Sequence, residues 1–434
     1  MAEVAAQAAG ECAAAAWAWV LEQVRWDAHG PWIPLTVPTS GDFPSAPPPD
    51  RDCLYDGIAG LAPALGEIRL TRRWTADEQR LADGIVARLS VAETGGDSSL
   101  YVGQAGSLAA VAVLDRSAAS SVLDRVEDRA TETGWPSPIF DDLTSPVNDL
   151  VLGDAGVVLA CAWFGGARVD ELVAVGADAL VGRARPAAHG LAWKMDERDR
   201  ERVMPNYSHG TAGIATALAV AGHHLGRPAL VEVARLGAEH LVGMADVGDE
   251  GFRLPLQVPP VDGDTEPYTY GWCHGPTGTA KLFGALRLAG VESVAGRSCA
   301  EWIDRAARSV RTSGLPARIR PGFWDNDGRC CGTAGVLSAT LDHAQDTGDA
   351  THLAFAEELA AALVERSVPN PADESLRRWQ FREHRADPPD QDPGVGWMQG
   401  AAGIVAALTR YARVREQGLA APRLALPDDG WMVA

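Results

Sequence analysis

The stretch Cys330-Cys331-Gly332-Thr333-Ala334-Gly335 ends in a Gly-x-x-Gly turn that recurs along the chain. Six further copies occupy residues 57–60, 103–106, 153–156, 210–213, 275–278 and 400–403. The first glycines of successive turns lie 46 to 68 residues apart. Self-similarity at such a period indicates a repeat architecture, in which each unit buries its apolar face against its neighbours. We therefore expect residues 1–434 to form one domain.

The repeat unit is predicted to be a helical hairpin. Each turn is followed by a run of small apolar residues, such as 336–341 or 404–408. Charged amphipathic segments precede the turns, at 75–93, 169–184, 228–244, 292–311 and 351–366. In the last of these, Leu353, Ala356 and Leu359 recur at helical spacing.

Other local signals in the sequence also favour helices over strands. Thr75 and Glu78 form a capping-box pair, and no run shows sustained strand alternation. The sequence therefore predicts an all-α fold in which seven hairpins close into an α/α toroid. Periodicity alone does not distinguish this closed toroid from an open superhelical solenoid.

The glycines are expected to serve packing. The first one would adopt backbone angles that other residues avoid, and the second would allow close helix approach. The residue just before each first glycine varies. In chain order these residues are Asp56, Val102, Leu152, His209, His274, Cys331 and Gln399.

If all the turns lie at one end of a ring, repeats four to six bring together five chemically active side chains. These are His209, Cys273, His274, Cys330 and Cys331, and repeat three adds Asp149. Three cysteines on consecutive repeats are soft ligands, and they predict a zinc–thiolate site.

Composition narrows the class of protein. No run of 18 or more uncharged apolar residues occurs, and no basic residue precedes Arg25, so neither a membrane span nor a secretory signal is expected. Seven cysteines without a disulfide pattern favour a reducing, cytoplasmic location. The formal charge of −20 disfavours nucleic acid as a partner and favours solubility, with a basic peptide partner as the alternative.

Four motifs resemble the lanthionine synthetase C-like (LanC-like) family over residues 50–417. They are Ser208-His209-Gly210-Thr211-Ala212-Gly213, Trp272-Cys273-His274-Gly275, Cys330-Cys331-Gly332-Thr333-Ala334-Gly335 and Gly396-Trp397-Met398-Gln399-Gly400-Ala401-Ala402-Gly403. The resemblance implies a seven-hairpin α/α toroid. It also implies one bound zinc ion and the addition of peptide cysteine thiols to dehydroalanine or dehydrobutyrine, which forms lanthionine or methyllanthionine rings.

Carried over by position, the zinc ligands are Cys273, Cys330 and Cys331. Many family members have a histidine as the third ligand, so Cys331 is a departure that resembles the tri-cysteine variant of some fused class II cyclases. Three thiolates give the site a net charge of −1, which implies a more nucleophilic substrate thiolate and a more reversible exchange.

The resemblance also implies the acid–base groups. His209 matches the family's motif histidine and is expected to act as general acid or base. Asp149 matches an acidic residue that would orient His209, with Asp154 inside the turn as a rival. His274 is expected either to bind the enolate or to have a structural role.

Three functions compete. The first is a stand-alone cyclase acting on a dehydrated precursor peptide. Because no kinase or dehydratase segment is fused to the repeats, a separate dehydratase or kinase/lyase partner would dehydrate that peptide. The second is the addition of glutathione, or another small thiol, to dehydroamino acids in proteins. The third is a non-catalytic zinc-bearing scaffold that binds peptides. An intact His209 beside the cysteines argues against the scaffold.

Overall fold

The computed structural model of the chain describes residues 2–39, 43–92, 95–137, 146–196, 203–248, 251–259, 267–317, 326–383 and 387–428. Contacts divide the chain into two compact units. Unit 1 comprises Met1–Ala92, Ala110–Ala119 and Ser313–Leu424, and unit 2 comprises Glu93–Ala109, Ser120–Thr312 and Ala425–Ala434.

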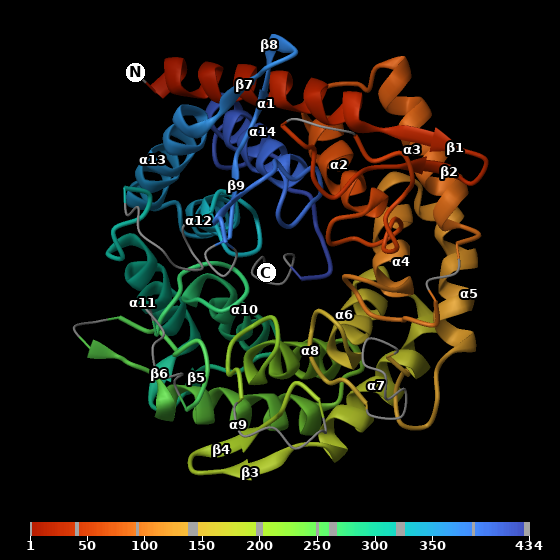
Figure 1. Ribbon diagram of the computed structural model, residues 1–434. Coiled ribbons are helices and arrows are strands. Elements are labelled where there is room, and N and C mark those ends of the chain that lie inside the picture. Colours follow the sequence, from red (N-terminus) through yellow and green to blue (C-terminus); the bar gives the residue numbers. More distant parts are fainter. Residues whose placement is uncertain are drawn as a thin grey trace. The chain divides into compact units, whose positions relative to one another are not determined.

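Unit 1 contains helices from the N-terminal and the C-terminal parts of the chain. Its helices are α1 (Ala2–Gln23), α2 (Leu61–Thr71), α3 (Ala76–Leu89), α12 (Thr333–Thr347), α13 (Ala350–Arg366) and α14 (Ala401–Gln417). Helix α14 lies against α1, α2 and α12, so segments nearly 400 residues apart share one core (Figure 1). The first nine residues of α14 are buried almost without interruption, because alanine and glycine allow neighbouring helices to approach closely.

Unit 2 is built from successive helical hairpins. Its helices are α5 (Ser120–Asp128), α6 (Asp154–Phe164), α7 (Asp170–Gly182), α8 (Thr211–His224), α9 (Pro228–Met244), α10 (Pro276–Leu288) and α11 (Cys299–Arg311). Helix α6 pairs with α7, α8 with α9 and α10 with α11, and α8 packs between α6 and α10 (Figure 1). Helix α4 (Gln104–Leu114) contributes residues to both units. Short 3₁₀ turns, η1 (Ile58–Gly60), η2 (Arg116–Ala119) and η3 (Ala167–Val169), precede α2, α5 and α7.

The predicted amphipathic segments are helices. The segment 228–244 is α9, and 75–93 and 169–184 contain α3 and α7. Helix α13 begins one residue before the segment 351–366 and ends with it. The segment 292–311 differs, because α11 begins only at Cys299 and Ser298 caps it. Before that cap, β5 (Ser293–Val294) and β6 (Arg297–Ser298) form a tight ribbon. Ala295 and Gly296, both with positive φ, make its turn.

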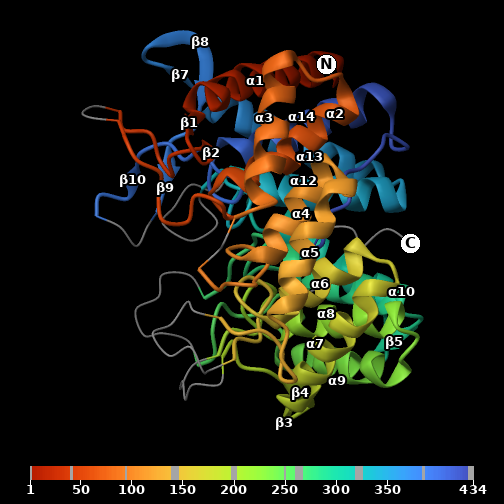
Figure 2. The same cartoon turned by 90° about the vertical axis from the view of Figure 1, so that its right-hand side faces the viewer.

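In the part of the chain that the structure describes, five antiparallel two-stranded ribbons interrupt the helical pattern. Besides β5–β6 they are β1 (Arg25–Asp27) with β2 (Gly30–Trp32), β3 (Arg185–Ala187) with β4 (Gly190–Ala192), β7 (Val368–Asn370) with β8 (Asp373–Arg378), and β9 (Phe381–Arg382) with β10 (Asp390–Gln391). Strands of two to six residues are too short to produce the sustained alternation that marks a strand in a sequence. Figure 2 shows the β7–β8 ribbon beside α1, which β8 contacts.

Glycine is required in the turns because a side chain would collide with nearby backbone. The expectation from the sequence that the first glycine adopts unusual backbone angles is wrong. Gly210, for example, has a φ of −142°, which any residue can adopt. An added Cβ there would lie 1.8 Å from the Met204 carbonyl oxygen. The second glycine is equally crowded: a Cβ on Gly278 would lie 1.9 Å from the Trp272 oxygen. Both glycines therefore let the preceding loop fold back onto the start of its helix.

Backbone hydrogen bonds join neighbouring turns within each unit. In unit 2, the Tyr101 amide donates to Val151, Leu150 donates to Ser208, and Ser208 donates to Cys273. In unit 1, the Cys330 amide donates to Met398 and the Met398 amide to Tyr55. The residues just before the glycines are thus aligned side by side within each unit.

One helical segment in the described part of the chain, Val4–Gln23, is long and apolar enough to cross a membrane by length and composition, with a mean hydropathy of 1.2. This is weak evidence, because α1 packs against α13, α14 and β8. The absence of a membrane span stays a prediction.

Candidate metal centre and acid–base pair

The three predicted cysteine ligands end the loops that precede two inner helices. Cys330 and Cys331 precede Gly332, the N-cap of α12, and Cys273 lies two residues before Gly275, the N-cap of α10. All three cysteines are buried. The sulfur atoms of Cys330 and Cys331 are 3.5 Å apart.

The three cysteines form a group that could hold a metal ion, since their sulfur atoms lie within 4.8 Å of one another. Zinc–sulfur bonds are about 2.3 Å long, which puts two sulfurs on one tetrahedral zinc about 3.8 Å apart. The sulfur spacing and the soft donor set therefore fit zinc. Burial also fits, because it limits competition from water.

His209 and Asp149 are in direct contact within unit 2. His209 Nδ1 lies 2.5 Å from Asp149 Oδ2. The other oxygen, Asp149 Oδ1, accepts the Leu152 amide at 2.6 Å, so both carboxylate oxygens are engaged. Asp149 is fully buried, whereas 23% of the His209 side chain is exposed. A histidine held through Nδ1 has Nε2 available for proton transfer.

Asp154, the alternative candidate for the partner of His209, contacts other residues. Its Oδ2 pairs with Arg183 at 2.6 Å and its Oδ1 accepts the Trp135 amide at 2.8 Å. Burial raises the pKa of this carboxyl to about 6, against the opposing pull of Arg183. The same Arg183 nitrogen donates to Asn148 Oδ1 at 2.8 Å, so Asp154 and Arg183 brace the loop that carries Asp149. The geometry favours Asp149 as the partner of His209.

His274 lies beside His209. The two ring centroids are 5.6 Å apart with the planes tilted by 37°, and His274 is buried. Unit 2 thus brings Asp149, His209 and His274 together. The catalytic roles of all three residues stay predictions.

A family model of lanthionine synthetase C-like proteins matches residues 48–419. The chain belongs to the lanthionine synthetase C-like family. The solved structure of nisin cyclase is 16% identical, with a TM-score of 0.60 over 86% of this chain and 90% of that chain. A sugar epimerase from a ruminal bacterium is 10% identical, with a TM-score of 0.51 over 96% of this chain and 99% of that chain. At these identities the two structures show the fold alone. Comparison with curated proteins finds no significant match.

The family and the nisin cyclase likeness confirm the predicted fold class, an all-α toroid. At family level, membership supports a cyclase-type activity. The substrate and the dependence on zinc go beyond these findings.

Two residues beside the LanC-like cysteine pair were not singled out from the sequence as site residues. Gln399 Nε2 lies 3.7 Å from Cys331 Sγ and 3.2 Å from the Tyr55 hydroxyl oxygen. Burial, and next the neighbouring Cys330 and Cys331, hold the pKa of Tyr55 well above its usual range. The available signal was position: Gln399 and Tyr55 precede turn glycines, as the cysteines do.

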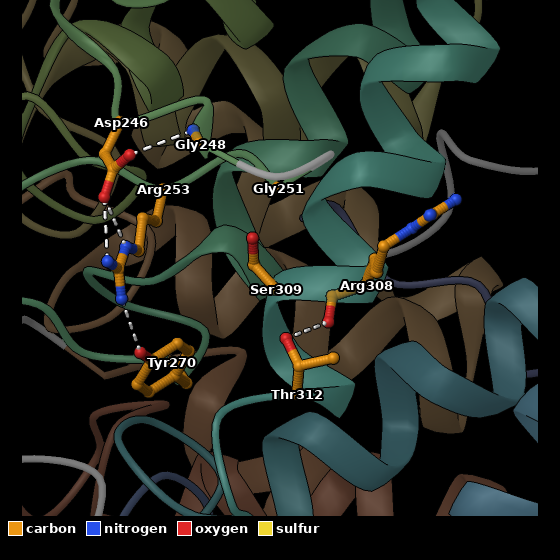
Figure 3. Close-up of a pocket in the computed structure, with 8 residues that line it drawn as sticks. All are labelled: Asp246, Gly248, Gly251, Arg253, Tyr270, Arg308, Ser309 and Thr312. Atoms are coloured by element: carbon orange, nitrogen blue, oxygen red, sulfur yellow. Dashed lines mark hydrogen bonds and ion pairs between the residues drawn. The ribbon is translucent and has the colours of Figure 1, made fainter.

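A separate pocket of about 320 Å³ lies in unit 2 next to the loop that leads to Cys273 (Figure 3). On one wall Arg253 pairs with Asp246 at 2.8 Å and donates to the Tyr270 hydroxyl at 3.2 Å. Another part is lined by Ser309 of α11 and by Thr312, the residue that follows this helix. Because Tyr270 is three residues from Cys273, the Arg253 contacts help to fix the loop of this LanC-like protein that carries the cysteine.

Proposed function

We propose that the chain is a zinc-dependent lanthionine-forming cyclase that adds peptide cysteine thiols to dehydroalanine or dehydrobutyrine. Its substrate would be a ribosomal peptide that a separate enzyme has dehydrated. Membership of the LanC-like family supports this class of reaction. The observation that carries the proposal is the group of three buried thiols, Cys273, Cys330 and Cys331, in a chain that also holds the His209–Asp149 pair.

Cys273, Cys330 and Cys331 would hold the zinc ion. When bound, zinc supplies a positive charge that favours the thiolate form of a thiol whose pKa is otherwise about 8.5. With three protein ligands the ion would keep one further position for a substrate thiol, as in catalytic rather than structural zinc sites. The buried cysteines also keep this part of the site away from bulk water.

His209 would move the proton. In the reaction, the substrate sulfur bonds to the β-carbon of the dehydroamino acid, and the electrons of the carbon–carbon double bond shift to form an enolate. The α-carbon then takes up a proton. The net change is addition of S–H across the double bond, so the reaction needs no other reagent. Nε2 of His209 can accept the thiol proton and return it to carbon.

Asp149 would hold the His209 ring in position and stabilise its protonated form, as carboxylates do for catalytic histidines. For His274, beside the His209 ring, we propose a hydrogen bond to the enolate oxygen. Oriented donors at such a position stabilise the charge that develops in the transition state.

The test compares two thiols. Purified protein would be incubated with a peptide that carries one dehydroalanine and one cysteine, and separately with a cysteine-free dehydroalanine peptide plus glutathione. Ring formation leaves the peptide mass unchanged but removes a thiol, so it is read by resistance to alkylation. Glutathione addition is read directly by mass.

The proposal predicts that the internal cysteine reacts much faster than glutathione at equal effective concentration. Faster glutathione addition across a panel of peptides would instead assign the small-thiol activity. Zinc-loaded protein that promotes neither reaction would contradict the enzymatic assignment and favour a scaffold.

A further inference from the structure

Hydrogen-bond donors converge on the cysteine pair from two neighbouring turns of unit 1. Gln399 has two side-chain N–H groups. Its nitrogen approaches Cys331 Sγ at 3.7 Å and the Tyr55 hydroxyl oxygen at 3.2 Å, so each hydrogen has an acceptor. The Tyr55 hydroxyl is in turn hydrogen-bonded to Cys330. Each sulfur of the pair is therefore contacted by one of these two residues, Gln399 and Tyr55, which we call the Gln399–Tyr55 relay.

The backbone holds this relay in place. The Met398 amide donates to the Tyr55 carbonyl at 2.9 Å, and the Cys330 amide donates to the Met398 carbonyl at 2.9 Å. The backbone amide of Gln399 is hydrogen-bonded to the Asp56 carboxyl. Because Gln399 Oε1 is buried without a hydrogen-bond partner among the described residues, its N–H bonds set the orientation of the amide.

Donors of this kind matter most where all the metal ligands are thiolates. A zinc ion with three cysteines carries a net charge of −1, and N–H···S and O–H···S contacts spread that charge. Partners outside the ligand set tune metal affinity and ligand basicity in this way.

We propose that Gln399 and Tyr55 are positioning residues that hold the Cys331 and Cys330 thiolates by hydrogen bonds and thereby allow a three-cysteine site to keep its metal near neutral pH. This inference rests on the metal site of the proposed function. It adds a defined role for two residues outside the ligand set.

The test measures zinc affinity in the full chain by competition with a chromophoric chelator between pH 6 and 8. Gln399→Met removes both N–H donors at similar side-chain volume, and Tyr55→Phe removes only the hydroxyl. Loss of such a partner typically weakens metal binding about 10- to 100-fold. Because metal binding displaces three thiol protons, the pH of half-release should rise by about 0.3 to 0.7 unit.

Two matched controls separate this effect from general destabilisation. Gln345→Met removes an amide that donates to the Leu419 and Ala421 carbonyls at 3.0 and 2.9 Å. Tyr411→Phe removes a buried hydroxyl that has no hydrogen-bond partner among the described residues. Both controls should keep the wild-type zinc affinity, even if Gln345→Met melts at a lower temperature.

Cobalt substitution gives a second readout that does not depend on activity. Loss of a hydrogen bond to a coordinated thiolate should shift the sulfur-to-cobalt charge-transfer band to lower energy in Gln399→Met and Tyr55→Phe but not in the controls. Wild-type zinc affinity and an unshifted band in folded Gln399→Met would overturn the inference, as would a wild type that binds no metal. If the wild type holds zinc, the variants behave as expected and no thioether forms, the inference stands and only the proposed function fails.

Discussion

At the scale of single residues, the contact between His209 and Asp149 has the most direct chemical consequence. Because the buried Asp149 carboxylate contacts Nδ1 of His209, Nε2 is the ring nitrogen that is available for proton transfer. We predict that His209→Ala keeps its zinc and slows thioether formation by about 10²- to 10⁴-fold, the usual contribution of a general acid or base. Asp149→Asn should slow the reaction less. Rates would be followed by thiol alkylation, with zinc content measured on the same samples.

A surface pair offers the matched control for this prediction. His224 contacts Asp170 at 2.9 Å, and the Asp170 side chain is 56% exposed. His224→Ala should leave the rate unchanged. If His209→Ala also reacts at the wild-type rate, His209 has a structural role and the proposed proton transfer is wrong.

Residue spacing predicted that the cysteines, His209 and Asp149 lie together, because repeats place residues before the glycines in register, and the family resemblance implied that Asp149 orients His209. The resemblance left Asp154, inside the turn that follows Asp149, as a rival partner for His209. The structure separates them by partner: Asp154 is bonded to Arg183 and Asp149 to His209. The Gln399–Tyr55 relay could not be predicted, because it depends on which way two long side chains point.

At the scale of elements, the turn glycines should be intolerant of even one methyl group. A Cβ on Gly403 would lie 2.0 Å from the Trp397 carbonyl oxygen, which is backbone and cannot rotate away. We predict that Gly403→Ala lowers the free energy of unfolding in urea by about 3 kcal/mol or more. Gly182→Ala is the control, because a Cβ there meets nothing within 4 Å. A neutral Gly403→Ala would contradict the steric explanation of the repeats.

The capping box of α3 carries a pH-dependent share of stability. Burial alone would raise the pKa of Glu78, but hydrogen bonds from Arg72, the Thr75 amide and Trp17 lower it to about 2. Because the folded-state pKa is depressed, the contribution is fully present above pH about 4.5 and is lost as pH falls toward 2.

We therefore predict that Glu78→Gln costs about 1–3 kcal/mol in unfolding free energy at pH 7, and that this difference shrinks between pH 4.5 and 2. The exposed Asp77 in the same helical turn provides the control, and Asp77→Asn should cost much less. A Glu78→Gln penalty that stays constant down to pH 2 would rule out this origin.

Helices were easier to predict than their boundaries. The 3.6-residue pattern located α9 and α13 within one residue, because both have long apolar faces in contact with an inner helix. The start of α11 was missed, since a two-residue ribbon and a turn with Ala295 at positive φ leave no periodic signal. The other ribbons were missed for the same reason.

At the scale of the whole molecule, the fold should not depend on the metal. The inner helices of each unit are buried among apolar side chains, so the cores exist without an ion. We predict that chelation leaves the helical circular dichroism unchanged and lowers the melting temperature only modestly, unlike in small zinc domains that unfold without metal. Loss of most of the helical signal on chelation would contradict this prediction.

In the proposed function, three cysteines hold the metal on which thioether formation depends. Elemental analysis and ring formation should therefore be measured together on wild type and on the Cys330→Ala, Cys331→Ala double variant. We predict about one zinc per wild-type chain together with ring formation, and neither in the folded double variant. Full zinc retention or undiminished ring formation in that variant would contradict it.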